Sequence, residues 1–128
     1  MAEGYAKNSR LDDAQNELRK AMDDADQTGG HFFDAELYRI GGEIALRSDP
    51  PDSLAAERKF REAIAVAKRQ EARLWELRAT ISLARLLRDT NRRDEAHSML
   101  GEIYNWFTEG IDLPDIKEAK ALLDELTV

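Results

Sequence analysis

Three arginines on one predicted helix suit the binding of carboxylates. Arg78, Arg85 and Arg88 fall within a helix predicted over residues 74–90. Spacings of seven and three residues put them on one side of that helix. A guanidinium group presents parallel N–H donors to a carboxylate, so this row suits an acidic peptide or a C-terminal carboxylate. The alternative is an ordinary solvated helix face.

A second charged row accompanies them on a helix predicted over residues 32–47. If both helices are the first helices of stacked hairpins, the two rows line the concave face of an array. The alternative again is a solvated face, with pairs such as Glu36–Arg39 and Glu43–Arg47 inside one helix. The candidate partner-binding residues are Glu36, Arg39, Glu43, Arg47, Arg78, Arg85 and Arg88.

Other reactive residues form no recognisable catalytic or metal-binding motif. His31 and His97 are the only histidines and there is no cysteine, so zinc lacks its usual set of three or four converging ligands. No glycine-rich loop ends in Lys-Ser or Lys-Thr, the phosphate-binding signature. The sequence therefore predicts no catalytic residue, no cofactor and no metal ion, and we expect a protein that is not an enzyme.

Composition narrows the class of protein further. The 128 residues are 42% hydrophobic and 35% charged, which fits one helix-rich domain. A net charge of −7 argues against nucleic acid as a partner, because phosphate binding needs a basic surface. No apolar run approaches the roughly 20 residues of a membrane span. The lack of cysteine and of a signal peptide leads us to expect a cytoplasmic protein.

Three stretches share one register, in which an alanine precedes a large apolar residue by four positions. The alanines are Ala14, Ala56 and Ala96, at spacings of 42 and 40 residues. Self-similarity at this period is typical of stacked helical repeats. The fold class predicted is all-α: antiparallel helical hairpins stacked as a solenoid, with five full helices after an N-terminal stub and a capping helix at the end.

The boundaries follow from helix-starting and helix-stopping residues. Ser9 is expected to cap the first full helix and Asn91 the fifth, each with an aspartate three residues later. The whole chain is read as one domain, with a partial first repeat over 1–30, a second over 31–70, a third over 72–110 and the capping helix over 112–127. The stub suggests a piece cut from a longer array.

The register also predicts the core. Phe60 and Leu100 hold the same repeat position and should be buried between hairpins. Gly41 and Gly42 in mid-helix each cost about 1 kcal/mol relative to alanine, which indicates close helix approach at that point. Trp106, an aromatic residue at helical spacing, is expected to pack in the core.

The segment Leu83-Ala84 through Leu87, Asn91, Glu95-Ala96 and Leu100 resembles one tetratricopeptide repeat (TPR). Asn91 stands where that family usually has glycine. The C-terminal part, from Tyr104-x-Trp-Phe-Thr-Glu-Gly to Leu126, resembles the end of large bacterial signalling ATPases of the class III adenylate or guanylate cyclase and transcription-regulator types. The resemblance implies that the cyclase and ATPase parts lie outside this chain.

We therefore expect a protein–protein interaction or regulatory scaffold module that binds a protein or peptide, with an acidic one favoured by the arginine rows. The alternatives are a small-ligand sensor with a pocket in the concave groove, and a purely structural end of a solenoid. Because the first hairpin lacks most of one helix, its apolar residues should be only partly covered. Self-association as a two-fold homodimer is predicted through Leu11, Leu18 and Met22.

Overall fold

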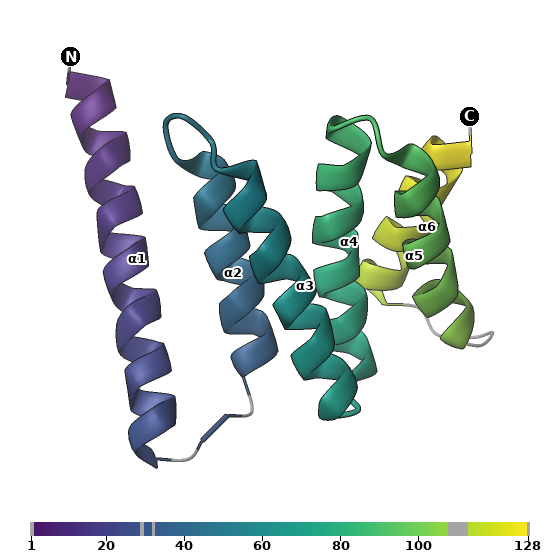
Figure 1. The fold of residues 1–128 in the computed structure, drawn as a ribbon, viewed down its shortest axis with the longest axis horizontal. Helices are drawn as coiled ribbons and strands as arrows, with labels where there is room; N and C mark the ends of the chain where they lie inside the picture. The colour runs from purple at the N-terminus through teal and green to yellow at the C-terminus, as the bar shows by residue number, and fades with distance from the viewer. Residues whose placement is uncertain (1, 29, 32, 108–112, 128) are drawn as a thin grey trace.

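The computed structural model describes residues 2–28, 30–31, 33–107 and 113–127, and over these residues the chain is all-helical. The side chains of residues 2–11, 25, 26 and 28 lie outside the description. Figure 1 shows the helices in chain order, from α1 at one end to α5 and α6 at the other. Their bounds are α1 Ala2–Thr28, α2 Asp34–Arg47, α3 Ser53–Arg69, α4 Arg73–Asp89, α5 Arg93–Trp106 and α6 Pro114–Thr127.

The first helix corrects the prediction of a stub. Ser9 is predicted to start a separate helix, but α1 runs without a break from Ala2 to Thr28. Serine inside a helix costs less than about 1 kcal/mol relative to alanine, so a residue that is able to cap a helix does not by itself end the turn before it. No proline or glycine stands between Tyr5 and Thr28 to break the helix. The described chain therefore has six helices, and the first one absorbs the stub.

The turns that follow α3 and α4 share one hydrogen-bonding pattern. After α4, the amide of Arg92 donates to the carbonyl of Leu87 (2.7 Å), and the amide of Asn91 donates to that of Arg88 (3.3 Å). Asn91 has φ of 64°, and Glu71 after α3 has φ of 55°. Asparagine tolerates this left-handed conformation at the end of a helix. Asn91 therefore ends α4, and its predicted role as the N-cap of α5 is wrong, because Arg92 is the residue at that position.

Neighbouring helices in the chain pack against each other, and alternate helices also meet. Each helix contacts the next, α2 contacts α4, and α4 contacts α6. Helix α4 is the centre of this packing: Leu77, Leu83 and Leu87 on it are fully buried. By contrast, within the described residues α1 contacts only α2 among the helices. The described molecule thus has a well-packed middle and one sparsely held helix.

The predicted core residues are found in the core. Phe60 on α3 and Leu100 on α5 are both 0% exposed, which confirms their placement by the repeat register. A Cβ atom added at Gly42 would lie 2.5 Å from the Phe60 ring, so α2 and α3 approach closely where the sequence predicts it. Trp106 is 53% exposed, so its expected core position is wrong.

Candidate functional site

The candidate partner-binding residues lie on α2 and α4, and the structure adds a third helix to them. Helix α6 packs beside α4, and three of its carboxylates reach the α4 arginines. We call the combined set the charged face. It consists of Glu36, Arg39, Glu43 and Arg47 of α2, Arg78, Arg85 and Arg88 of α4, and Asp115, Glu118 and Glu125 of α6.

Arg78 joins the three helices of the charged face. Its Nη1 lies 3.2 Å from a carboxylate oxygen of Glu36 on α2, and its Nε lies 3.8 Å from Asp115 on α6. Glu36 also accepts two hydrogen bonds from Arg39, at 3.0 and 3.1 Å. The pair Glu36–Arg39 therefore forms as expected, and it is extended to the neighbouring helices.

The other two α4 arginines face α6. Arg85 pairs with Glu118, and Nη1 of Arg88 donates to both carboxylate oxygens of Glu125 at 3.1 and 3.2 Å. Arg88 also donates from Nε to Asp89, at 2.9 Å. The hydrogen bond to Asp89 is the main cause that raises the pKa of Arg88 above its ordinary value. These arginines therefore hold the last helix against α4.

Glu43 and Arg47 behave differently from the rest of the charged face. The predicted pair between them is not formed, and the structure gives neither side chain an ion pair with another described residue. Glu43 is half-buried and Arg47 is exposed. They are the charges on this face that remain available to an outside partner.

The balance of charge on this face removes the reason for expecting an acidic partner. Five arginines stand with five carboxylates, so the face carries no excess of positive charge. Carboxylates of α2 and α6 already pair with the α4 arginines, so an acidic partner would have to displace them. Ion pairs as exposed as these contribute roughly 0–1 kcal/mol each, so their role is mainly one of positioning.

A second ionic cluster, on α3 and α5, was not foreseen from the sequence. Arg61 donates to Glu57 and to Glu95, in both cases at 2.9 Å. Arg92, at the start of α5, donates to Glu57 at 2.7 Å and to Glu95 at 2.9 Å. The four side chains form a closed ring of alternating charge, which we call the ionic ring. It bridges α3 and α5 across the surface of α4.

The ionic ring lowers the pKa of both of its carboxylates. The hydrogen bond from Arg92 is the largest cause that holds the pKa of Glu57 below its ordinary value, and burial opposes it. For Glu95 the hydrogen bond from Arg61 is the largest cause that lowers the pKa. Both carboxylates are therefore stabilised in their charged form. Local spacing could have suggested Glu57–Arg61 and Arg92–Glu95, but the links Arg61–Glu95 and Arg92–Glu57 join residues that are 34 and 35 positions apart.

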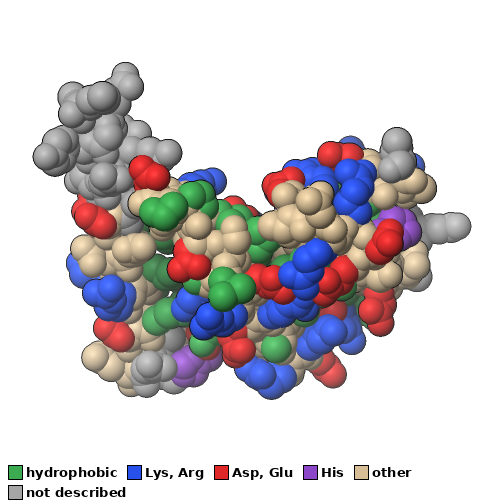
Figure 2. Space-filling model, turned by 45° about the horizontal axis from the view of Figure 1, so that its top comes forward, with side chains coloured by type: hydrophobic (Ala, Val, Ile, Leu, Met, Phe, Trp, Pro, Cys, Tyr) green, Lys and Arg blue, Asp and Glu red, His purple; other side chains and the backbone are tan. Residues whose placement is uncertain are grey.

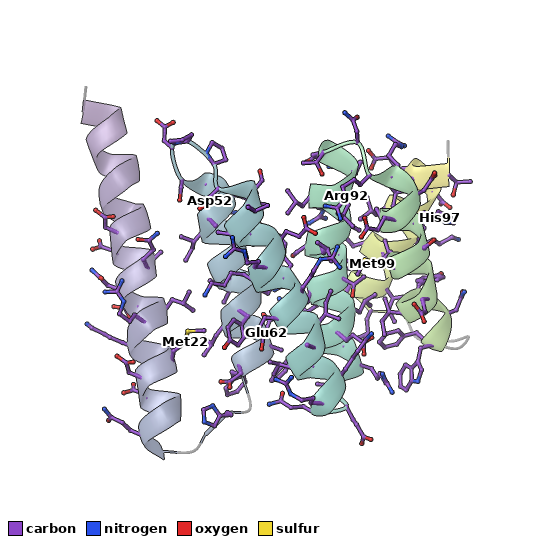
Figure 3. All side chains as sticks on the ribbon, in the orientation of Figure 1. Met22, Asp52, Glu62, Arg92, His97 and Met99 are labelled. Atoms are coloured by element: carbon purple, nitrogen blue, oxygen red, sulfur yellow. The ribbon has the colours of Figure 1, made fainter. Side chains whose placement is uncertain are left out.

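Two of the predicted self-association residues, Leu18 and Met22, line a groove between α1, α2 and α3. Leu18 and Met22 on α1 are partly exposed, and Leu18 lies against Gly41 of α2. Leu11 also belongs to α1, but its side chain lies outside the described part. Figure 2 shows hydrophobic side chains gathered in the hollow beside α1, and Figure 3 shows Met22 extending from α1 toward its neighbours.

The groove encloses about 420 Å³ and differs in composition from the charged face. Ile44, Ala45 and Ala55 add apolar surface from α2 and α3, and Arg19 and Lys59 supply charges. Because α1 contacts α2 and not α3, the groove stays open on one side. Such a surface suits an apolar side chain from a partner protein.

Comparison of the chain with protein-family models, curated proteins and solved structures finds no match in any of the three. In the described part of the chain, no group of three or more His, Asp or Glu residues is placed to hold a metal ion. None of the described helices is both long and apolar enough to cross a bilayer. The resemblance to tetratricopeptide repeats and to signalling ATPases therefore rests on the residues alone.

Proposed function

We propose that this chain is a non-catalytic protein-interaction module built from stacked, TPR-like hairpins. The pairing of helices supports this, because α2 packs on α3, α4 packs on α5, and α2, α4 and α6 also meet in series. Hairpins stacked in this way contact only their neighbours and present an extended surface to partners. The left-handed Asn91 at the position where the family usually has glycine is a second support.

The parent protein that we propose is a bacterial signalling ATPase of the cyclase or transcription-regulator type, with this chain in its C-terminal region. The proposal rests on the resemblance of the segment from Tyr104 to Leu126. Reading the coding region upstream of Met1 tests it. An adjoining ATPase or nucleotide cyclase domain supports the proposal, and its absence removes it.

The contact that we propose is self-association through α1 and the groove beside it. One observation carries this: in the described part of the chain α1 contacts a single other helix, whereas every other helix contacts at least two. Its apolar residues Leu18 and Met22 are partly exposed as a result. A second copy that covers this side would remove that apolar surface from water, most simply about a two-fold axis.

Sedimentation velocity over a wide range of protein concentration tests the contact. We expect the unmodified chain to shift from monomer to dimer as concentration rises, and Leu18→Glu to shift the transition to much higher concentration. Glu17→Gln, at an exposed neighbouring position of α1, is the matched control and should leave the transition unchanged.

A second variant distinguishes a lost contact from unfolding of α1. Met22→Gln keeps side-chain length and helix propensity while adding a polar end, so helicity measured by circular dichroism should be retained. Dimerisation weakened in Met22→Gln at unchanged helicity supports the groove as the contact. A chain that stays monomeric at every concentration would exclude the homodimer and leave the purely structural role as the better account.

A further inference from the structure

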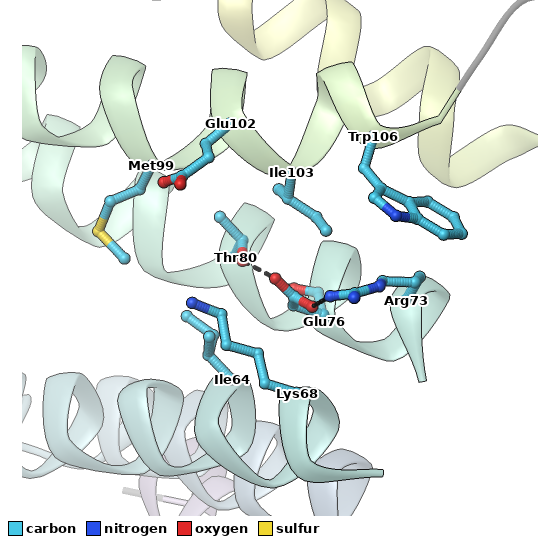
Figure 4. A pocket seen from close by; sticks show the side chains of 9 residues that line it. All are labelled: Ile64, Lys68, Arg73, Glu76, Thr80, Met99, Glu102, Ile103 and Trp106. Carbon is cyan, nitrogen blue, oxygen red and sulfur yellow. Dashed lines mark hydrogen bonds and ion pairs between the residues drawn. The ribbon is translucent and has the colours of Figure 1, made fainter. Parts of the chain in front are cut away.

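A separate cavity lies between α3, α4 and α5, on the far side of α4 from the charged face. It encloses about 280 Å³, slightly below the lower end of the usual range for small-molecule sites. Figure 4 shows side chains from all three helices converging on it. Its lining consists of Ile64 and Lys68 of α3, Arg73, Glu76 and Thr80 of α4, and Met99, Glu102, Ile103 and Trp106 of α5.

One wall of the cavity is a fixed ion pair. The Glu76 side chain is only 7% exposed, and its carboxylate lies 3.0 Å from Nη1 of Arg73. The guanidinium group of Arg73 in turn lies 5.2 Å from the centre of the Trp106 ring. A buried carboxylate needs such a partner, because an unpaired buried charge is costly. Arg73 is thus held between Glu76 and Trp106. The charges of Arg73 and Glu76 offset each other.

Two further charges face the cavity without a partner of their own. Lys68 extends from α3 and Glu102 from α5 toward the same space, as Figure 4 shows. Neither side chain makes an ion pair or hydrogen bond with another described residue. Since Arg73 and Glu76 offset each other, the cavity offers one available cation and one available anion.

The remaining surface of the cavity is mostly apolar. Ile64, Met99 and Ile103 line the cavity around the two unpaired charges, and the half-exposed Trp106 stands at one end. The buried Thr80 hydroxyl donates to the Glu76 carbonyl at 2.7 Å, so it offers acceptor capacity only. The polar groups that can fix a ligand are therefore few and are separated by apolar surface, as in small-molecule sites.

We propose that this cavity binds a small zwitterion, an α-amino acid with an apolar side chain. Its carboxylate pairs with Lys68, its ammonium group with Glu102, and its side chain lies against Ile64 and Ile103. A ligand with no net charge matches a cavity whose own charges sum to zero, whereas a simple anion or cation leaves one charge unpaired. This proposal does not depend on self-association through α1.

Fluorescence of Trp106 reports binding directly. The chain has two tryptophans, so Trp75→Phe leaves Trp106 as the sole emitter and keeps an aromatic ring at position 75. The probes are L-leucine, 4-methylpentanoate, which lacks the ammonium group, and 3-methylbutylamine, which lacks the carboxylate. We expect saturable quenching by leucine and binding at least about tenfold weaker for each of the other two, because each loses a charge-assisted contact.

Charge-neutralising variants locate the site. Lys68→Gln and Glu102→Gln should each weaken leucine binding by about tenfold or more. Lys20→Gln and Glu17→Gln make the same charge changes on exposed positions of α1 and should leave leucine binding unchanged. Both sets of positions are exposed, so we expect all four variants to fold.

Three results would overturn the proposal. The first is no saturable response to leucine. The second is equal or tighter binding of 4-methylpentanoate or 3-methylbutylamine, which would make the site one for anions or cations. The third is leucine binding that Lys68→Gln and Glu102→Gln leave unchanged, which would place the ligand elsewhere.

Discussion

The seam between α3 and α5 and the groove between α1 and α3 occupy equivalent places in the repeat register, yet the ionic ring bridges the first and no such ring bridges the second in the described residues. Relative to Ala56, the ionic ring uses Glu57 and Arg61 of α3, and relative to Ala96 it uses Arg92 and Glu95. The equivalent residues beside α1 are Gln15, Arg19, Asp52 and Ala55, and all four line the groove.

The two regions differ in the side chains at these four positions. At the groove an amide replaces one carboxylate, alanine replaces the other, and an aspartate stands where the ring has Arg92. Only Arg19 keeps its type. A ring of alternating charge cannot form there, and the helix that it would hold contacts only α2. The same repeat positions thus carry a ring of ion pairs in one place and line an open groove in the other.

The largest expected effect comes from truncating the shared core position in each repeat. Phe60→Ala and Leu100→Ala remove fully buried side chains and should each lower the free energy of unfolding by roughly 2–5 kcal/mol. Leu18→Ala, at the equivalent position of the sparsely held α1, should cost less than either. Urea unfolding followed by circular dichroism measures all three. Equal costs at the three positions would contradict the contrast between the two regions.

The glycine pair of α2 offers the next test, because its members face the two regions separately. Gly42→Ala pushes a methyl group into the Phe60 ring and should cost about 1–3 kcal/mol through overpacking. Gly41→Ala meets the end of Leu18 at 3.2 Å, and the gain of about 1 kcal/mol in helix propensity offsets much of that contact. Thermal unfolding of the two variants should therefore differ clearly, and similar melting temperatures would count against the packing described.

The sequence predicted the interior of this fold better than its surfaces. The burial of Phe60 follows from the periodicity of apolar residues, and the close helix approach at Gly42 follows from the cost of glycine in a helix. Both are local properties of the sequence. The helix start predicted at Ser9 is wrong because a capping residue permits a helix to begin but does not require it. The α4 arginines were recognised, but their partners on α6 could not be, because that pairing depends on how two distant helices pack.

Acid should weaken the ionic ring selectively. The pKa of Glu57 is lowered in the folded protein from an ordinary value of 4.5, so its contribution to stability is complete above pH 4.5 and is lost as pH falls through the lower folded value. We expect the free energy of unfolding to decline below that pH, and Glu57→Gln to decline less steeply. Glu17→Gln, an equal charge change on α1, is the control. Parallel declines in both variants would show that the ionic ring adds nothing.

The smallest effect comes from restoring part of the ring beside α1. Ala55→Glu places a carboxylate at the position equivalent to Glu95, within the groove that Arg19 also lines. A partly exposed pair of this kind should add about 0–1 kcal/mol, reduced by salt. In Ala55→Glu we therefore expect the amides of α1 to exchange more slowly at low salt than at high salt. Exchange that is faster than in the unmodified chain would contradict this.

Hydrogen exchange measured against protein concentration tests the central claim, which is that the α1 side is open in one chain and is covered by a second. We expect amides of α1 to exchange faster than those of α4 in dilute solution, because a helix with few contacts opens at lower free energy. As concentration rises, protection of residues 12–27 should increase, while that of Arg73–Asp89 in α4 stays constant. If α1 is as protected as α4 in dilute solution, or if its protection does not change with concentration, the account is wrong.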